Sequence, residues 1–370
     1  MTALFHFLKS NMVFTLAALG ALGSMAFVPP SRAYAGYVDC RTLALLFCLM
    51  AVVAGFEKAG VFARLASRLF HVLGTVRQLA GAMIFLCFFA SMWITNDVSL
   101  ITFVPFALDV FHQAGEDRQL GKVVVLQTVA ANLGSMCTPV GNPQNLYLFL
   151  ISGMGVGDFV KLLLPYTVVS FVLLLVSLWW FPSQPVTLLQ EKPASQGLNS
   201  SRLPLPALLS LFLFCMLTVG NVLDYRLTLG LVLGVMLLRE RDILKKVDYI
   251  LLLTFVAFFV LIGNLKQIPL IYGFLTHYTA GHEVLVSLLA SQVISNVPAA
   301  ILLSGFTRDY AGLMIGTDIG GLGTLIASMA SLISYQLYVK RMGQARPYLV
   351  TFTWVNGLFL GILVICYLLL

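Results

Sequence analysis

Residues 85–108 read FLCFFASMWITNDVSLITFVPFAL, an apolar run that the polar triplet 95–97 interrupts halfway. An ionisable side chain at bilayer depth costs about 2.5–3.5 kcal/mol on insertion scales, so the aspartate of this triplet indicates a functional site. The interruption recurs with an offset of 200: residues 90–96 are ASMWITN and residues 290–296 are ASQVISN. These two runs decide the fold that the sequence predicts.

The composition is that of an integral membrane protein. Of 370 residues, 59% are hydrophobic and 10% charged, and the mean hydropathy is +0.95. Soluble domains carry about 25% charged residues. Apolar runs near the roughly 20 residues that cross a bilayer recur throughout the chain. The net charge of +7 is spread over short loops, so we expect the lipid bilayer as a partner and no nucleic acid. The six cysteines show no CxxC spacing and are interpreted as small membrane hydrophobes.

The chain divides into six predicted segments. An N-terminal transmembrane helix comes first, although Lys9, an apolar stretch and an A-x-A site ending at Ala35 leave a cleaved signal peptide as the alternative. A polar stretch of Pro, Ser, Gln and Gly then separates two halves. The segments are the N-terminal helix 1–37, the first repeat 38–181, a cytoplasmic linker 182–203, linking or scaffold helices 204–246, the second repeat core 247–340 and a C-terminal transmembrane helix 341–370.

The basic residues predict the orientation. If the interrupted pairs 80–93 with 98–111 and 284–294 with 297–306 are re-entrant hairpins, 16 of the 22 Lys and Arg residues lie inside and 6 outside. Two full crossings for either pair would spoil this bias. We therefore expect a multi-pass protein of the plasma (cytoplasmic) membrane with its N-terminus in the cytoplasm. Residues 61–74, with arginines at i and i+4, are interpreted as an interfacial amphipathic helix on the cytoplasmic side.

Further matches occur in the same order in both halves. VD at 38–39 recurs at 247–248, and NLGSMCTPV at 132–140 aligns with DIGGLGTLI at 318–326. The predicted topology places the first VD outside and the second inside, so the halves are inverted. The predicted fold class is an all-α polytopic membrane protein with two inverted-topology repeats, each containing a re-entrant helical hairpin and a discontinuous transmembrane helix.

Helix breakers lie where this architecture needs them. TPVGNPQN at 138–145 holds two prolines and a glycine, GTDIGGLGT at 316–324 holds four glycines, and SNVP follows the second tip at 295–298. Isolated breakers also arise from close packing or kinks. Non-helical backbone at membrane depth is tolerated only where it is buried in protein or lines a wet cavity. Inverted repeats with broken helices are typical of secondary transporters, whose sites lie at the repeat interface.

The candidate binding residues come from the two tips and the two broken segments. Each half offers one carboxylate, Asp97 and Asp318, for which capping of a helix is the alternative role. The candidate substrate and ion-binding residues are Thr95, Asn96, Asp97, Asn132, Gly134, Ser135, Thr138, Gly141, Asn142, Asn145, Ser295, Asn296, Thr317, Asp318, Gly320 and Thr324.

The charge of these segments bears on the substrate. Neither tip and neither broken segment contains Lys or Arg, so an anionic substrate would need helix N-termini and a co-bound cation. Na⁺ suits carboxylate and amide oxygens, and the sites expected for it are Asn96, Asp97, Asn296 and Asp318. A proton on either aspartate would serve as well, and no other cofactor is expected. His277 and His282 are interpreted as loop histidines, because HEVLV at 282–286 lacks the second histidine of a zinc motif.

At these residues the sequence resembles the ion transporter superfamily, which includes arsenite permeases, citrate permeases, divalent anion/sodium symporters and one type of sodium/proton antiporter. TNDVSLITFVPF and SNVPAAILL are similar to its hairpin tips, and ANLGSMCTPVGNPQN and GTDIGGLGTLIAS to its unwound segments. The symporters carry Ser-Asn-Thr at both tips, whereas 95–97 is Thr-Asn-Asp and 295–297 is Ser-Asn-Val. The resemblance implies a scaffold and a moving transport domain, a homodimer and alternating access.

We therefore expect a secondary active transporter of a small anion or oxyanion, coupled to Na⁺ or H⁺. The alternative in the same superfamily is a Na⁺/H⁺ or arsenite/H⁺ antiporter. An enzyme is not expected, since the sequence has no HExxH motif, no nucleophile elbow and no carboxylate pair at catalytic spacing. A passive channel is disfavoured because inverted halves suit alternating access and no ring-forming filter is visible.

Overall fold

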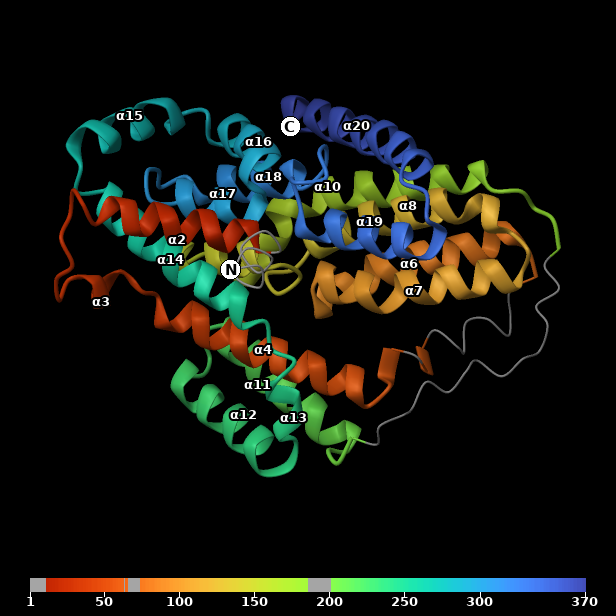
Figure 1. Cartoon of the computed structure of the whole chain (residues 1–370), viewed down its shortest axis with the longest axis horizontal. Coiled ribbons are helices and arrows are strands. Elements are labelled where there is room, and N and C mark those ends of the chain that lie inside the picture. The colour runs from red at the N-terminus through yellow and green to blue at the C-terminus, as the bar shows by residue number, and fades with distance from the viewer. Residues whose placement is uncertain (1–10, 63, 66–73, 186–200) are drawn as a thin grey trace.

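The computed structural model describes residues 11–62, 64–65, 74–185 and 201–370, and this part of the chain is helical (Figure 1). Its one β feature is an isolated bridge between Thr75 and Pro185. The predicted interfacial helix 61–74 and the linker 182–203 lie largely outside the described residues.

The helices are α2 (Met12–Ser24), α3 (Tyr34–Tyr37), α4 (Cys40–Lys58), α6 (Val76–Ile94), α7 (Asn96–Gln113), α8 (Leu120–Ser135), α9 (Pro143–Ser152), α10 (Val156–Ser177), α11 (Leu205–Val219), α12 (Tyr225–Arg239), α13 (Arg241–Leu244), α14 (Tyr249–Leu265), α15 (Pro269–Thr279), α16 (Glu283–Ile294), α17 (Asn296–Leu303), α18 (Tyr310–Gly320), α19 (Met329–Met342) and α20 (Arg346–Leu369), with short 3₁₀ turns η1 (Asp117–Gln119) and η2 (Leu178–Trp180).

Several of these helices are long and apolar enough to cross a membrane. In the described ranges, four pass by length and hydropathy: α4, α6, α20, and α10 extended through η2 to Trp180. A fifth candidate is the pair α14 and α15, which is bent by 106°. These spans make the chain a multi-pass membrane protein. Helix α6, predicted as one arm of a re-entrant hairpin, is therefore itself of spanning length.

The first interrupted run forms an antiparallel helical hairpin. Helices α6 and α7 meet at Thr95 and fold back on each other, since Ser99 Oγ in α7 donates a 3.2 Å hydrogen bond to the carbonyl oxygen of Cys87 in α6. Further from the tip, the Gln127 side chain of α8 donates to the carbonyl oxygens of Met83 and Phe103, at 3.5 and 3.3 Å. One amide thus ties both arms of the hairpin to α8.

The second interrupted run folds in the same way. Helices α16 and α17 meet at Ser295, and the far ends of the two arms come together where Thr307 Oγ1 donates a 2.8 Å hydrogen bond to Glu283 Oε1. The arms are shorter than in the first hairpin, since α17 ends at Leu303. Both hairpins therefore turn at the residues that the sequence predicts.

The helices are interrupted in both stretches that the sequence predicts as broken spans. Helix α8 ends at Ser135 and α9 begins at Pro143, with Asn142 capping α9 through its side chain. Helix α18 ends at Gly320 and α19 begins at Met329. Residues 136–142 and 321–328 are the two unwound segments. Pro139 and Gly141 lie in the first segment and Gly321 and Gly323 in the second, as expected from the missing N–H of proline and the conformational freedom of glycine.

Glycines allow each broken helix to lie against its hairpin. A Cβ added at Gly134 of α8 would lie 2.1 Å from the Phe88 carbonyl oxygen, and one at Gly320 of α18 would lie 2.9 Å from Leu288 Cα. Phe88 and Leu288 are related by the sequence offset of 200. The same close approach therefore recurs in both halves.

One helix departs from the prediction. Helix α15 occupies residues that the sequence predicts as a loop, and His277 lies in its last turn, so the interpretation of His277 as a loop histidine is wrong. Its neighbour His282 lies outside a helix, directly before α16. The bend before Pro269 ends the apolar run of α14, so α15 is not marked by a long apolar segment of its own.

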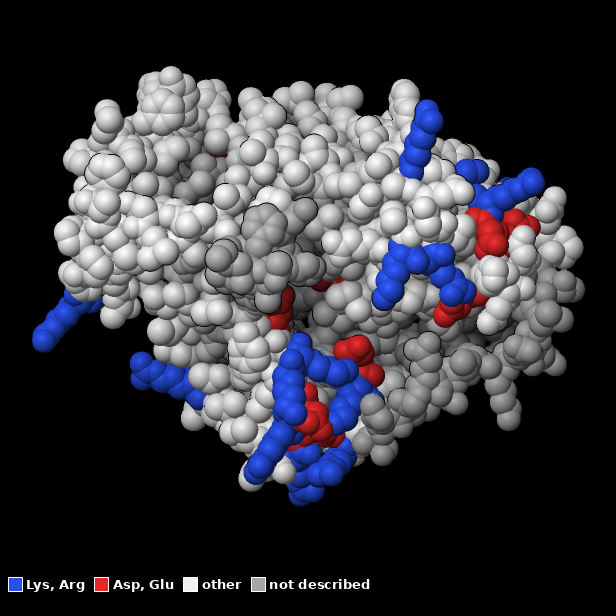
Figure 2. Space-filling view, viewed as in Figure 1, with Lys and Arg blue, Asp and Glu red and all other residues white. Residues whose placement is uncertain are grey.

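Most charged side chains on one face of the molecule lie in a lower group and a group at the right, with isolated Lys or Arg side chains at the left edge (Figure 2). Ion pairs beside α4 are Lys58–Glu240 at 2.7 Å and Lys246–Glu57 at 3.6 Å. A further ion pair, Arg341–Asp109 at 3.3 Å, joins α19 to α7. Helices α11 and α12 pack on α4 (Figure 1), and Phe212 of α11 also contacts Trp93 near the tip of the first hairpin.

Candidate functional site

The two hairpin tips share one unusual backbone conformation. Thr95 has φ 71° and ψ 150°, and Ser295 has φ 75° and ψ 154°. This region is essentially restricted to glycine and costs a side-chain-bearing residue about 1–3 kcal/mol. Such strain persists only where the surroundings enforce it, and it is concentrated at functional sites. The repeated sequence match at 90–96 and 290–296 is therefore also a match in local geometry.

Each tip is fastened to the unwound segment of its own half. The backbone N–H of Asn96 donates to the carbonyl oxygen of Gly141 at 3.1 Å, and that of Asn296 donates to the carbonyl oxygen of Ala327 at 2.9 Å. In both asparagines the side-chain oxygen accepts from the next backbone N–H at 2.9 Å. Each asparagine thus satisfies one backbone N–H in the first turn of the returning helix, while its amide NH₂ group points elsewhere.

The free amide of Asn96 joins a buried cluster that links the two halves. Asn96 Nδ2 donates to Asn132 Oδ1 at 3.0 Å, and Ser328 Oγ donates to the same oxygen at 2.9 Å. Asn132 Nδ2 lies 3.5 Å from Ser331 Oγ. Asn132 belongs to α8, whereas the serines belong to the end of the second unwound segment and to α19. The other tip asparagine, Asn296, lies next to Gly321, where an added Cβ would be 2.9 Å from Asn296 Nδ2.

Asp318 forms the most extensive polar contact between the halves. Its side chain is buried in α18, and its carboxylate accepts hydrogen bonds from amides of the first half. Asn142 Nδ2 donates to Oδ1 at 3.1 Å, Gln144 Nε2 to Oδ1 at 3.4 Å and Asn145 Nδ2 to Oδ2 at 2.8 Å. No described basic side chain pairs with it. A buried carboxylate without a counter-ion is costly, so amide dipoles alone hold this charge in the structure.

Asp97 lies in a second environment, at the wall of a cavity of about 230 Å³. Thr95 and Asn142 line the same cavity, together with Glu57, Lys246 and Asp248. The Oδ1 atom of Asp97 is buried and has no hydrogen-bond partner among the described residues. An unpartnered carboxylate oxygen facing a cavity is a natural ligand for a cation or an acceptor for a proton.

Two further oxygens near Asp318 are unpartnered in the described part of the chain. They are Gln144 Oε1 and Asn145 Oδ1, which belong to the side chains whose NH₂ groups hold Asp318. A hard monovalent cation prefers carboxylate and amide oxygens. The residues around Asp318 thus provide oxygen ligands that the protein itself leaves unused.

Three of the candidate threonines serve the backbone. Thr138 Oγ1 donates to the Met92 carbonyl oxygen, and Thr324 Oγ1 donates to the Gln292 carbonyl oxygen at 3.0 Å, again with an offset of 200 between acceptors. Thr317 Oγ1 donates within its own helix at 2.7 Å. Thr324 is exposed, and its hydrogen bonds are with Gln292 and not with the Asp318 cluster.

The remaining candidates shape the turns around the tips. Ser135 Oγ accepts a 3.3 Å hydrogen bond from Asn142 Nδ2. Gly141 lies against the Ser135 carbonyl oxygen, where an added Cβ would approach to 2.0 Å. Ser295 Oγ lies 3.4 Å from the Ala327 carbonyl oxygen. The contacts of Ser135 and Gly141 fold residues 136–142 into a compact turn that delivers Asn142 to Asp318.

The structure brings several residues to this region that the sequence did not indicate. Ser328 and Ser331 join the Asn132 cluster, whereas Gln144, which lies in the predicted first broken segment, joins the Asp318 cluster. Lys246 and Asp248 reach the Asp97 cavity from the start of α14. The repeated VD dipeptide at 247–248 was a signal for this segment. The absence of basic residues from the tips therefore does not leave the cavity without a cation, because Lys246 lines it.

These features define a class of protein: a polytopic helical membrane transporter in which two hairpin tips are bonded to two unwound segments beside buried polar groups. The chain belongs to the citrate transporter family, whose pattern it matches over residues 3–311. It is a membrane transporter, not an enzyme.

Its relatives include two proteins of similar length. The chain is 32% identical over 301 residues to the uncharacterized transporter MJ0456 of Methanocaldococcus jannaschii, covering 81% of each chain. It is 30% identical over 341 residues to inner membrane protein YbiR of Escherichia coli, covering 89% of this chain and 88% of the relative. The silicon efflux transporter LSI3 of Oryza sativa subsp. japonica is 31% identical over 170 residues, 44% of this chain and 34% of the relative.

Proposed function

We propose that the chain is a secondary active transporter that moves a small anion or oxyanion by alternating access, coupled to Na⁺ or H⁺. The observation that carries this proposal is the buried carboxylate of Asp318, which belongs to one half and is held by three amides of the other. A site at such an interface changes its shape when the halves move against each other. The family's description as citrate transporters favours an anionic substrate.

The proposal includes the inverted arrangement of the two halves. The tips at Thr95 and Ser295 share one strained backbone conformation. Thr138 and Thr324 make equivalent hydrogen bonds, because their acceptors, Met92 and Gln292, are 200 residues apart. The distribution of 16 inside and 6 outside basic residues supports opposite orientations and a cytoplasmic N-terminus. We include a homodimer in the proposal, as the resemblance to the superfamily implies.

Coupling is assigned to the two aspartates. Asp97 Oδ1 and the amide oxygens of Gln144 and Asn145 are unpartnered acceptors in the described chain, which suits a cation that arrives with the substrate. A proton on either carboxylate is the other means of neutralising these buried charges. Either ion would reduce the cost of moving an anion through the apolar interior of the membrane.

The second candidate is an antiporter of the same superfamily, exporting a small oxyacid or Na⁺ in exchange for protons. The relative named a silicon efflux transporter favours this direction of transport. The carboxylate Asp97 at the first tip, facing a cavity, would carry the proton in that cycle.

The test is gradient-driven transport by the purified chain in proteoliposomes. Citrate uptake is measured under an inward Na⁺ gradient, an inward proton gradient or neither, and arsenite and silicate efflux are measured in parallel. We expect uphill movement of at least one anion under one gradient, and its loss in Asp97→Asn, while Asp117→Asn, an exposed acid, keeps it. Flux that follows only the substrate's own gradient would show a channel and refute the proposal.

A further inference from the structure

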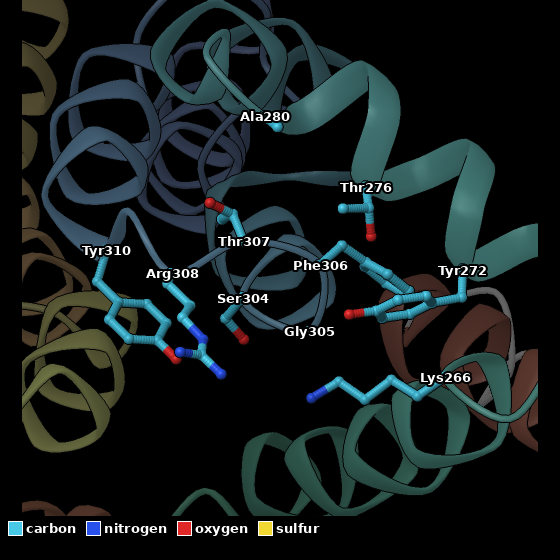
Figure 3. A pocket seen from close by; sticks show the side chains of 10 residues that line it. All are labelled: Lys266, Tyr272, Thr276, Ala280, Ser304, Gly305, Phe306, Thr307, Arg308 and Tyr310. Atoms are coloured by element: carbon cyan, nitrogen blue, oxygen red, sulfur yellow. The ribbon is translucent and has the colours of Figure 1, made fainter.

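A second cavity in the described part of the chain lies outside the site at the hairpin tips. It has a volume of about 460 Å³ and lies between the end of α14, α15 and the segment that joins α17 to α18 (Figure 3). None of the candidate residues predicted from the sequence lines it. Its lining residues are Lys266, Tyr272, Thr276, Ala280, Ser304, Gly305, Phe306, Thr307, Arg308 and Tyr310.

The charge of this cavity is positive. Figure 3 shows the ammonium group of Lys266 and the guanidinium group of Arg308 extending into the space from different elements. No described acidic side chain forms an ion pair with either group. The neighbouring acids are already engaged, since Glu283 accepts from Thr307 Oγ1 at 2.8 Å and Asp309 caps α18. Two unneutralised cations facing one cavity repel each other unless an anion lies between them.

The remaining lining groups add hydrogen-bond donors. The hydroxyl of Tyr272 faces the same space (Figure 3), whereas Ser304 Oγ already donates to the Ile301 carbonyl oxygen at 2.7 Å. Thr276 Oγ1 is buried and has no partner among the described residues. Arginine and lysine with hydroxyl donors around them form the usual protein surroundings of phosphate and carboxylate oxygens. A metal cation would be repelled, because the lining contains no acidic side chain.

The fold holds the two cations in place. Lys266 follows the last residue of α14, and its methylene chain crosses Gly305, where an added Cβ would lie 3.1 Å from Lys266 Cε. Arg308 comes two residues before α18. Ser304, at the base of the same segment, makes a 2.8 Å hydrogen bond with Tyr147 OH in α9. That helix also carries Asn145, a partner of Asp318, so the cavity and the Asp318 cluster are joined through α9 and α18.

We propose that this cavity binds a multivalent anion through its phosphate or carboxylate oxygens, with Lys266 and Arg308 as the charged partners. The anion is either a small soluble molecule or the headgroup of an acidic lipid. Helix α15 does not distinguish between these two sources. Its Leu270 and Phe274 are exposed and apolar, whereas its Tyr272 and Thr276 line the cavity. The proposal does not depend on transport activity, because it concerns equilibrium binding at residues outside the transport site.

The test is thermal stabilisation of the purified full chain in a neutral detergent, with sodium phosphate or sodium citrate compared with sodium chloride at equal ionic strength. Ligand that binds only the folded state raises the melting temperature by mass action. We expect the apparent affinity to fall about tenfold in Lys266→Gln or Arg308→Gln, corresponding to one charged hydrogen bond each, and stabilisation to vanish in the double variant. Lys161→Gln with Arg226→Gln makes the same charge change at exposed positions elsewhere and should leave it unchanged.

The lipid source is distinguished by repeating the measurement in nanodiscs of phosphatidylcholine with and without phosphatidylglycerol. Stabilisation by phosphatidylglycerol that requires Lys266 and Arg308 identifies a headgroup, whereas stabilisation by citrate or phosphate alone identifies a soluble anion. Lys266→Arg and Arg308→Lys keep the charges and should keep binding, which guards against variants that fail to fold. No stabilisation by any of the three probes, or equal loss in the control pair, would overturn the proposal. Retention of binding in Asp318→Asn separates this site from the proposed transport site.

Discussion

Asn145 Nδ2 donates a 2.8 Å hydrogen bond to Asp318 Oδ2, and this contact joins residues 173 positions apart from the two halves of the chain. It is the shortest of three amide contacts to the same carboxylate. Asp318 lies next to the end of α18, and Asn145 in the first turn of α9. Both residues therefore lie beside unwound segments, where a small movement of the backbone alters the distance between them.

Replacing the carboxylate tests its role directly. Asp318→Asn keeps the shape of the side chain but removes the charge and places an NH₂ group against amide donors. We expect gradient-driven transport to fall by at least about tenfold, the loss of one charge-assisted hydrogen bond, with the protein still folded in detergent. Asp309→Asn is the matched control. Asp309 is the N-cap of α18, and Asn caps a helix about as well as Asp. Normal transport by Asp318→Asn would remove this carboxylate from the mechanism.

The two tip asparagines provide a test of the two-sided site. Asn96→Ala removes the donor to Asn132 Oδ1 and the acceptor for the Asp97 backbone N–H, and Asn296→Ala removes the equivalent acceptor for the Val297 backbone N–H. Loss of a buried hydrogen-bond partner costs about 1–3 kcal/mol, so both variants should weaken substrate binding to a similar extent, measured by ligand-dependent melting. Asn356→Ala, a buried asparagine in α20, controls for stability loss alone. An effect confined to one tip would contradict a site built from both.

How far the sequence predicted these features depends on whether the signal is local. The breaks at Thr95 and Ser295 were visible because burying a polar triplet within an apolar run is costly, and the structure places the turns there. Helix α15 was missed because no long apolar run marks it after the bend at Pro269. The pairing of Asp318 with Asn142, Gln144 and Asn145 follows from packing between halves, which residue spacing does not encode.

The cavity beside Asp97 illustrates the same limit. Lys246 and Asp248 reach it from a helix start far away in sequence, and no pattern near the tip indicates them. Conversely, Thr138 and Thr324 were recognised as a repeated pair, but their hydroxyls anchor backbone in the structure. Repetition in a sequence identifies equivalent positions without distinguishing binding from folding.

The close glycine contacts predict different costs for two alanine substitutions. Gly134→Ala would place a Cβ 2.1 Å from the Phe88 carbonyl oxygen, and Gly320→Ala one 2.9 Å from Leu288 Cα. Overpacking of this kind costs about 1–3 kcal/mol, so both variants should melt earlier, Gly134→Ala by more. Gly230→Ala in α12 has nothing within 4 Å, and its higher helix propensity should stabilise by about 0.5–1 kcal/mol. Equal melting temperatures for all three variants would show that the hairpins do not need close contact.

Glu240 predicts how stability responds to acid. It lies after α12 with a side chain only 2% exposed, 2.7 Å from Lys58 Nζ and 3.0 Å from Ser201 Oγ. Burial acts to raise the pKa of Glu240, but hydrogen bonds from Lys58, the Arg202 backbone and Ser201, with the charge of Lys58, outweigh it and hold the pKa below its ordinary value of 4.5. A carboxylate with a lowered folded-state pKa stabilises the fold above its unfolded pKa and loses that contribution as the pH falls through the folded value.

Melting temperatures of the wild type should therefore drop as the pH is lowered below about 4.5, and Glu240→Gln should remove part of that drop while lowering stability at neutral pH. The loss at neutral pH arises because Lys58 is left without its partner. Asp242→Asn is the matched control, because its pair with Lys245 is 77–82% exposed, and exposed pairs contribute about 0–1 kcal/mol. If the melting temperatures of Glu240→Gln and the wild type fall equally as the pH is lowered, the Lys58–Glu240 pair does not link α4 to α12 with measurable strength.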